Sequence, residues 1–178
     1  ALPTSVNMRI YLVLLLICLC IACREKNPQI PANKPASEHS SQNELLAYNK
    51  ACLQAEMDEI NAFLQTNNQF VACDDGWWIR YLSKESGENI KPMQQVTLRY
   101  SVARLDGTVC YSSDTDGDKT LVVGKRQWLQ GMDLLLPTLT VGSEVEVILP
   151  SRMAYGLRGK DNCIGSYCPL LCHIKILQ

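Results

Sequence analysis

The chain lacks the excess of basic residues that nucleic-acid-binding proteins show. Its 178 residues contain 17 Lys and Arg against 18 Asp and Glu, which gives a formal net charge of −1. Because phosphate binding depends on clustered Lys and Arg, this balance argues against a nucleic-acid partner. The hydrophobic content of 47% suits one globular domain of ordinary size with accessory segments.

The sequence also lacks the common motifs of phosphate, nucleophilic and metal chemistry. It has no glycine-rich phosphate loop, no Gly-x-Ser-x-Gly elbow and no convincing cysteine and histidine pair. Residues 114–118 begin like a calcium loop, but Lys125 stands at the twelfth position, where such a loop needs a bidentate glutamate. We therefore interpret residues 114–118 as a solvated turn and expect neither a cofactor nor a metal.

The apolar run of residues 10–22 is too short to cross a bilayer as a helix of about 20 residues. It suits the h-region of a secretory signal, so residues 1–22 are expected to be a signal peptide with an upstream extension. Ala22 directly precedes Cys23, as in bacterial lipoprotein signals, although Cys20 stands where such sites usually carry leucine. We expect acylation of Cys23, with a plain signal peptide or signal anchor as the alternative.

A lipid on Cys23 would anchor the mature protein in the cell envelope, facing the periplasm, at either the inner or the outer membrane. Six further cysteines could pair in that oxidising compartment: Cys52, Cys73, Cys110, Cys163, Cys168 and Cys172. Sequence does not determine connectivity, and Cys163 with Cys168 is the first pair we would test. A zinc site of Cys163, Cys168, Cys172 and His173 is disfavoured because it lacks the short two-residue spacing of zinc clusters.

Three segments separate the signal from the globular domain. Residues 23–42 are polar and contain three prolines, which is typical of a disordered tether. In residues 43–67 apolar side chains recur mostly every three or four positions, which predicts an amphipathic helix. We expect this helix to pack on the domain, with dimerisation or partner binding as the alternative. Residues 68–95 contain an aromatic strand at 77–82 and a polar loop.

From residue 96 onward the pattern is one of short strands and turns. Hydrophobic and polar residues alternate in 96–102 and 144–149, as in half-buried antiparallel strands. Asp106-Gly107 predicts a hairpin turn. Residues 129–139 have helical spacing, and Pro137 must interrupt or end the regular part. The pattern indicates an α+β fold in which a curved antiparallel β-sheet wraps around a short helix.

An ordered set of motifs follows within residues 96–177: Leu98-Arg99-Tyr100, Leu105-Asp106-Gly107-Thr108, Ser112-Ser113, Val123-Gly124, Leu139-Thr140-Val141-Gly142-Ser143, Ala154-Tyr155-Gly156, Ile164-Gly165, Pro169-Leu170 and Ile174-Lys175-Ile176-Leu177. In this order they resemble the FKBP-type peptidyl-prolyl cis-trans isomerases, which implies an isomerase domain over residues 96–178. The preceding helix and aromatic strand are similar to those of lipoprotein members from Bacteroidetes-type bacteria.

The resemblance implies the site residues and their roles. Tyr155 matches the tyrosine that donates to the carbonyl of the bound substrate, and Ile164 matches a loop isoleucine that lines the pocket with its side chain and backbone N–H. Tyr100 and Trp128 match further catalytic-site positions; from spacing alone they would be ordinary core aromatics. The remaining pocket positions are Cys110, Tyr111, Leu121, Leu129, Met132 and His173.

Three departures from the family pattern bear on activity. Met132 stands where the family has an aromatic floor, Cys110-Tyr111 where it has Phe-Asp, and His173 where an aromatic of the last strand is expected. The resemblance implies rotation of X-Pro bonds in envelope proteins, in an apolar pocket that favours the twisted amide. The alternative is a catalytically weak FKBP-fold binding or chaperone lipoprotein of an envelope assembly. The expected partners are proline-containing segments of exported proteins.

Overall fold

The computed structural model describes residues 36–178, and for residues 36–40 the backbone alone. The expected signal peptide, Cys23 and the first part of the tether lie outside the described residues. The chain divides into two units, Ala1–Glu44 and Leu45–Gln178, and all contacts discussed below belong to the second. None of the helices within residues 36–178 combines the length and the hydropathy of a bilayer-spanning helix.

Helix α2 (Ala36–Thr66) begins earlier than the sequence pattern indicated. The expectation that the tether extends to residue 42 is therefore wrong over its last residues. No proline or glycine lies between residues 36 and 66, so nothing interrupts the helix until Pro35, which directly precedes it. At the other end, Asn67 Nδ2 and Thr66 Oγ1 both donate to the carbonyl oxygen of Phe63, at 2.9 and 3.0 Å. These bonds satisfy a carbonyl that the ending helix leaves without a partner.

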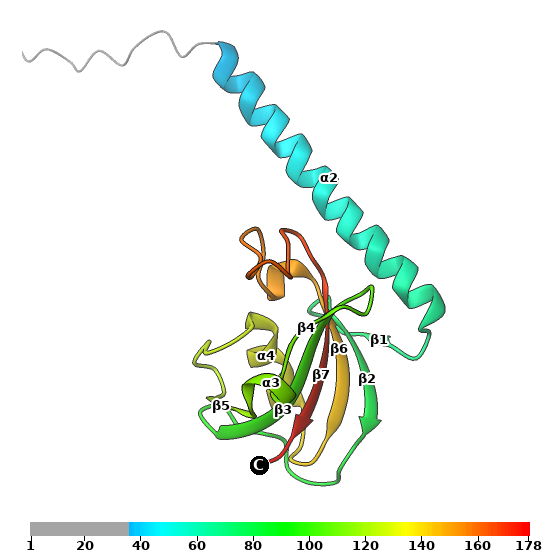
Figure 1. Ribbon diagram of the computed structural model, residues 1–178, viewed down its shortest axis with the longest axis vertical. Coiled ribbons are helices and arrows are strands. Elements are labelled where there is room, and N and C mark those ends of the chain that lie inside the picture. Colours follow the sequence, from blue (N-terminus) through cyan, green and yellow to red (C-terminus); the bar gives the residue numbers. More distant parts are fainter. Residues whose placement is uncertain (1–35) are drawn as a thin grey trace, which may run out of the picture. The chain divides into compact units, whose positions relative to one another are not determined.

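The second unit is built on a seven-stranded sheet, and all its described strand pairs are antiparallel (Figure 1). The strands are β1 (Val71–Ala72), β2 (Trp78–Ser83), β3 (Gln95–Arg104), β4 (Val109–Ser112), β5 (Lys119–Val122), β6 (Glu144–Leu149) and β7 (Leu170–Ile176). Their spatial order is β1-β2-β6-β7-β3-β4, and β5 pairs with the first half of β3. The expected α+β fold with a curved antiparallel sheet is confirmed.

The remaining helices are short: α3 (Ser113–Asp116), α4 (Gln130–Leu135) and the 3-10 turns η1 (Leu136–Thr138) and η2 (Ser151–Met153). Helix α4 and η1 form the helical segment expected at residues 129–139. The regular α-helix ends at Leu135, two positions before Pro137, whose ring and missing N–H prevent it from continuing. A Cβ on Gly131 would lie 2.7 Å from the Leu149 side chain, so glycine allows α4 to approach β6 closely.

Hydrophobic residues are buried on both faces of the sheet. The larger core lies between the concave face and α4 and includes Val96, Leu98, Val145, Val147, Met132 and Leu135. On the opposite face, Ile60 of α2 packs with Phe70 and Ile148. The end of α2 thus packs on the domain, as expected. Its earlier apolar residues Leu45, Leu46 and Tyr48 are more than half exposed.

Two polar contacts bind α2 to loops of the domain. Glu56 is only 5% exposed, and its carboxylate accepts hydrogen bonds from the backbone N–H of Ser151 and, at 2.9 Å, from the Ser151 hydroxyl. The Tyr167 hydroxyl donates to Asn49 Oδ1 at 2.7 Å. A buried carboxylate requires such donors because the charged form is costly to remove from water. The part of the helix that contains Asn49 and Glu56 is therefore held against the domain.

A disulfide joins Cys110 of β4 to Cys163 in the loop before β7, with the Cα atoms 5.6 Å apart. The pair that we would have tested first, Cys163 with Cys168, is therefore wrong, and Cys168 is a free thiol. The fold brings the edge strand β4 next to this loop. The closeness of Cys163 and Cys168 in the sequence gave no indication of that contact. Cys172 is also free and is fully buried in the main core.

Replacement of Glu56 by alanine should lower the free energy of unfolding by about 2 to 3 kcal/mol, because it leaves the buried N–H and hydroxyl of Ser151 without an acceptor. Urea unfolding of the two proteins measures the difference. Gln54→Ala, an exposed change on the same helix, is the control and should shift stability by less than about 0.5 kcal/mol. Equal effects of the two substitutions would contradict a structural role for Glu56.

The double substitution Cys110→Ser/Cys163→Ser should lower the free energy of unfolding by about 3 to 4 kcal/mol, since the bond closes a loop with a sequence separation of 53. A reductant should destabilise the wild type by the same amount and leave the double variant unchanged. Peptide mapping of the alkylated, unreduced protein identifies the pair directly. Recovery of Cys163 linked to Cys168 would contradict the connectivity.

Candidate active site

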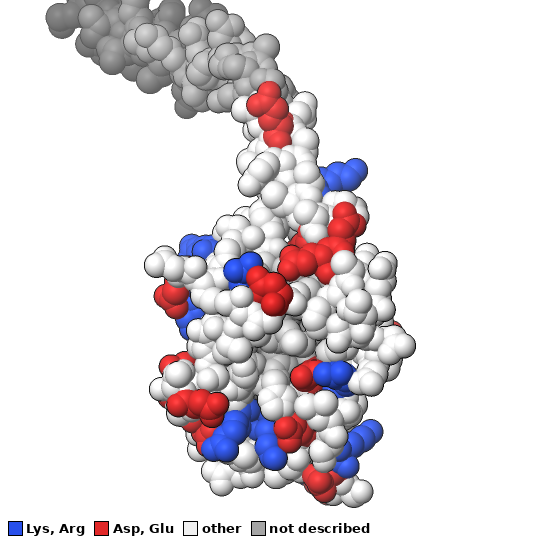
Figure 2. Space-filling model, turned by 45° about the vertical axis from the view of Figure 1, so that its right-hand side comes forward, with Lys and Arg blue, Asp and Glu red and all other residues white. Residues whose placement is uncertain are grey.

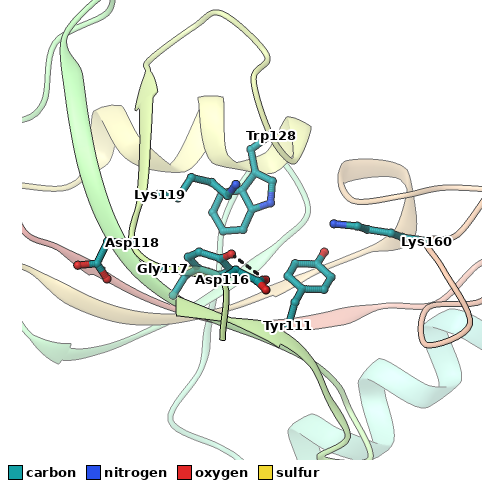
Figure 3. Close-up of a pocket in the computed structure, with 8 residues that line it drawn as sticks. Tyr111, Asp116, Gly117, Asp118, Lys119, Trp128 and Lys160 are labelled. Carbon is teal, nitrogen blue, oxygen red and sulfur yellow. Dashed lines mark hydrogen bonds between the residues drawn. The ribbon is translucent and has the colours of Figure 1, made fainter. Parts of the chain in front are cut away.

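A cavity of about 180 Å³ lies at the concave side of β3, beside the turn that follows β4 (Figure 3). Its lining residues are Tyr100, Tyr111, Asp116, Gly117, Asp118, Lys119, Trp128 and Lys160. They come from four parts of the sequence: β3, the continuous stretch from β4 through α3 to β5, the loop before α4 and the loop before β7. The fold is therefore what assembles the site, and no short motif contains it.

Four aromatic rings contact one another in sequence, and we call them the aromatic row: Trp128, Tyr100, Tyr111 and Tyr155. The first three line the cavity, whereas Tyr155 adjoins it through its contact with Tyr111. Neighbouring rings meet edge to face, with centroids 4.9 Å apart for Trp128 and Tyr100, 6.3 Å for Tyr100 and Tyr111, and 6.1 Å for Tyr111 and Tyr155. Such pairs contribute about 0.5 to 1.5 kcal/mol beyond the area they bury. The row thus gives the site a rigid face against which an apolar ring can pack.

The hydroxyl groups of the row are oriented by hydrogen bonds. Tyr111 donates to the hydroxyl oxygen of Tyr155, so the proton of Tyr155 stays available to a ligand. Tyr100 donates to Asp116 Oδ2 at 3.3 Å. Burial raises the pKa of Tyr111, reinforced by its bond to Tyr155, and burial together with the Asp116 charge raises the pKa of Tyr100. Both phenols therefore keep their protons at neutral pH and act as hydrogen-bonding groups.

Four of the expected pocket residues lie behind the aromatic row and do not line the cavity. Leu121, Leu129, Met132 and Ile164 are each less than 5% exposed and belong to the main hydrophobic core. The backbone N–H of Ile164 donates to the carbonyl oxygen of Lys160 at 3.1 Å, so it is not free for a substrate. The expectation that these four side chains line the cavity is corrected accordingly. The order of the motifs indicated that these residues lie near the site, but it did not show whether their side chains line the cavity or belong to the core.

The turn formed by Lys160 and Ile164 depends on Gly159. The backbone of this glycine has a φ of +61°, and a Cβ there would lie 2.1 Å from the carbonyl oxygen of Ile164. Only glycine fits both the positive φ and this close approach. The turn places Lys160 at the edge of the cavity, opposite Tyr111.

His173 lies on the outer face of the sheet, so its assignment to the pocket is wrong. Its Nε2 atom lies 2.8 Å from Glu144 Oε1, and Lys175 Nζ lies 3.1 Å from the other oxygen of that carboxylate. The hydrogen bonds to Lys175, the larger cause, and to His173 lower the pKa of Glu144. Side chains alternate along a strand, and the neighbour that faces inward on β7 is Cys172, which is fully buried. Cys110 packs against the core and is held in the disulfide.

Sequence reasoning missed the charged residues of the site. Residues 114–118 were interpreted as a solvated turn, yet α3 and the turn after it bring Asp116 and Asp118 to the cavity. Lys119 and Lys160 also line it and were not singled out. Their places in the sequence could have indicated this, because Lys119 directly follows that turn and Lys160 lies between Tyr155 and Ile164. No group of three or more His, Cys, Asp or Glu side chains arranged to hold a metal occurs within residues 36–178.

Charged side chains of both signs lie close together on the face shown in Figure 2, with blue and red groups adjacent to each other over much of the domain. Their proximity agrees with the near-zero net charge. Attraction of a ligand therefore depends on local charges at the cavity rather than on the field of a whole face.

Comparison with known proteins agrees with this geometry. The family model of FKBP-type peptidyl-prolyl cis-trans isomerases matches residues 86–177. The probable isomerase FkpA of Neisseria meningitidis is 28% identical over 142 residues, which make up 72% of this chain and 48% of that protein. Human FKBP9 is 32% identical over 80 residues, or 44% of this chain and 14% of the relative. The chain thus spans less than half the length of either relative.

The fold is also found in a solved structure. The crystal structure of a peptidyl-prolyl cis-trans isomerase from Pseudomonas syringae superposes with a TM-score of 0.63, at 21% identity, over 72% of this chain and 93% of that one. Fold, ordered motifs and the match over residues 86–177 lead to one conclusion. The chain belongs to the FKBP-type peptidyl-prolyl cis-trans isomerase family.

Proposed function

We propose that the chain catalyses the cis-trans isomerisation of X-Pro peptide bonds at the cavity bounded by the aromatic row. The observation that carries this proposal is the hydrogen bond from Tyr111 to Tyr155, because a Tyr155 hydroxyl that accepts from Tyr111 keeps its own proton for a further acceptor. A prolyl ring would pack on Tyr100 and Trp128, and the carbonyl oxygen of the bound peptide would accept from Tyr155.

The chemistry requires no proton transfer. Rotation about the peptide C–N bond has a barrier of about 18 to 20 kcal/mol, because the twisted state loses amide resonance. The planar amide is more charge-separated than the twisted one, so a site with little water disfavours the planar form. A donor such as Tyr155 fixes the carbonyl while the prolyl ring turns. The raised pKa values of Tyr100 and Tyr111 suit this role, since neither phenol ionises near neutral pH.

A second function, peptide binding with little turnover, is favoured by the lining of the cavity. The expected apolar floor, Met132, is covered and only 1% exposed, whereas Asp116, Asp118, Lys119 and Lys160 reach the cavity. Water associated with these charges would weaken the preference for the twisted amide. Isomerisation remains our first proposal, at a rate below that of a site with an open aromatic floor.

Tyr155→Phe should lower kcat/KM for a proline peptide by about 3- to 10-fold, the loss expected for one hydrogen bond to a neutral carbonyl. Exchange NMR of the cis and trans peptide signals measures this rate without a coupled protease. Tyr81→Phe, on an exposed part of β2 away from the cavity, should change nothing. If the wild type binds the peptide without accelerating exchange, the binding function is correct and the isomerase proposal is not.

We propose further that the mature protein is a bacterial lipoprotein, anchored through Cys23 in the envelope and facing the periplasm, where it acts on proline-containing segments of exported proteins. The apolar run before Cys23 and the Cys110–Cys163 disulfide support this location, because disulfides persist in oxidising compartments. The similarity to Bacteroidetes-type lipoproteins stays a prediction.

The anchor is tested by labelling bacteria that produce the full chain with radioactive palmitate. The wild-type protein should incorporate the label and remain with the membrane fraction, and Cys23→Ala should abolish both, because the thiol carries the lipid. Cys20→Ala is the matched control and should still be labelled. Equal labelling of the wild type and Cys23→Ala would contradict acylation at Cys23.

A further inference from the structure

Two lysines at the cavity have no carboxylate partner. Lys119 and Lys160 take part in no ion pair among the described residues, although other basic side chains of the domain, such as Arg80, Arg99 and Lys175, form one. Figure 3 shows the two ammonium groups approaching the cavity from opposite sides, Lys119 beside Trp128 and Lys160 beside Tyr111. Neither charge is therefore neutralised by an ion pair within the described part of the domain.

Each ammonium group lies against ring faces of the aromatic row. Lys160 Nζ is 4.1 Å from the centroid of Tyr111 and 5.4 Å from that of Tyr155. Lys119 Nζ is 5.5 Å from the centroid of Tyr100 and 5.4 Å from that of Trp128. Such contacts hold the charge near the cavity, while an ammonium group with three N–H donors can still bind an acceptor.

The two acidic residues at the cavity are each bonded to a side chain other than these lysines. Asp118 pairs with Arg99, whose Nε atom lies 3.2 Å from Oδ1, and this pairing raises the pKa of Arg99. Asp116 accepts the hydroxyl proton of Tyr100. Both lysines are therefore open to a carboxylate that a ligand brings, and a charged hydrogen bond is stronger than a cation–π contact alone.

We propose that Lys119 and Lys160 select proline-containing segments in which an acidic residue is next to the proline. This inference rests on the proposed function, because it places the prolyl ring on the aromatic row between the two lysines. A Glu or Asp side chain before or after the proline would then reach one of the ammonium groups. The lysines act as specificity residues and take no part in the rotation itself.

Four peptides test the selection: Ala-Glu-Pro-Phe against Ala-Gln-Pro-Phe, and Ala-Pro-Glu-Phe against Ala-Pro-Gln-Phe. Exchange NMR with the disulfide-intact protein gives kcat/KM for each. We expect the acidic member of at least one pair to be favoured about 3- to 5-fold at low salt, the factor for a partly exposed ion pair. The ratio should fall toward one in 0.5 M NaCl because salt screens exposed charges.

Variants assign the effect to the two lysines. The double substitution Lys119→Gln/Lys160→Gln should reduce the ratio to about one, and Lys119→Arg/Lys160→Arg should retain it. Lys91→Gln is the matched control, since Lys91 is exposed, pairs with Glu88 and lies outside the cavity. The acidic-to-neutral ratio is the readout, so a change in overall rate caused by altered packing does not mimic the result.

The outcomes separate this inference from the proposed function. Acceleration of all four peptides with ratios of one would overturn the selection and leave the isomerase intact. A high ratio that survives the double Gln substitution would overturn the assignment to these lysines. If no peptide is accelerated, the isomerase proposal fails, and calorimetric titration with the same four peptides decides the selection. Tighter binding of an acidic peptide that is lost in the double Gln variant would support it, and equal affinities would overturn it.

Discussion

Strand β3 is the element on which the rest of the domain depends, because it pairs with β4, β5 and β7 at once. From Val96 to Val102 it buries alternate side chains, so its register determines which side chains of three neighbours face the core. Tyr111 lies opposite Val102, and Ile174 lies opposite Tyr100. The same pairing brings Tyr100 and Tyr111 into one row and directs His173 to the outer face.

The site also needs a second set of contacts, because the loop with Lys160 lies outside the sheet ladder. The Lys160–Ile164 turn shapes this loop, the Cys110–Cys163 bond ties it to β4, and Tyr167 joins it to Asn49 of α2. The helix is in turn fixed to the domain by Glu56. Groups far from the cavity thus determine where the ammonium of Lys160 lies.

The alternation in residues 96–102 and 144–149, and the turn at Asp106-Gly107, were sufficient to predict β3, β6 and the first hairpin. Three residues that the family resemblance implied for the site, Tyr100, Tyr111 and Trp128, line the cavity. Other features depend on information that a linear pattern lacks. An error of one residue in strand phase moves a side chain to the opposite face, which is why His173 was assigned to the pocket in place of the inward-facing Cys172.

Three other features were not predicted from the sequence, for a related reason: the Cys110–Cys163 disulfide, the burial of Met132, and the place of Lys119 and Lys160 at the cavity. Cys110 and Cys163 become neighbours only when β4 meets the loop before β7. Burial of Met132 depends on how the side chains of the main core pack around α4. Lys119 and Lys160 lie in segments with no periodicity, where composition alone suggests solvated side chains. The contacts of these two lysines can be recognised only in the folded protein, where other segments supply the aromatic rings that they meet.

Enclosure of Cys172 in the core has a consequence for oxidative maturation. Burial raises the pKa of its thiol to about 12, and exchange of disulfides requires a thiolate as the attacking group. In the folded protein the Cys172 sulfur therefore does not attack the Cys110–Cys163 disulfide. Mispaired isomers that involve Cys172 therefore form before the sheet closes around this side chain.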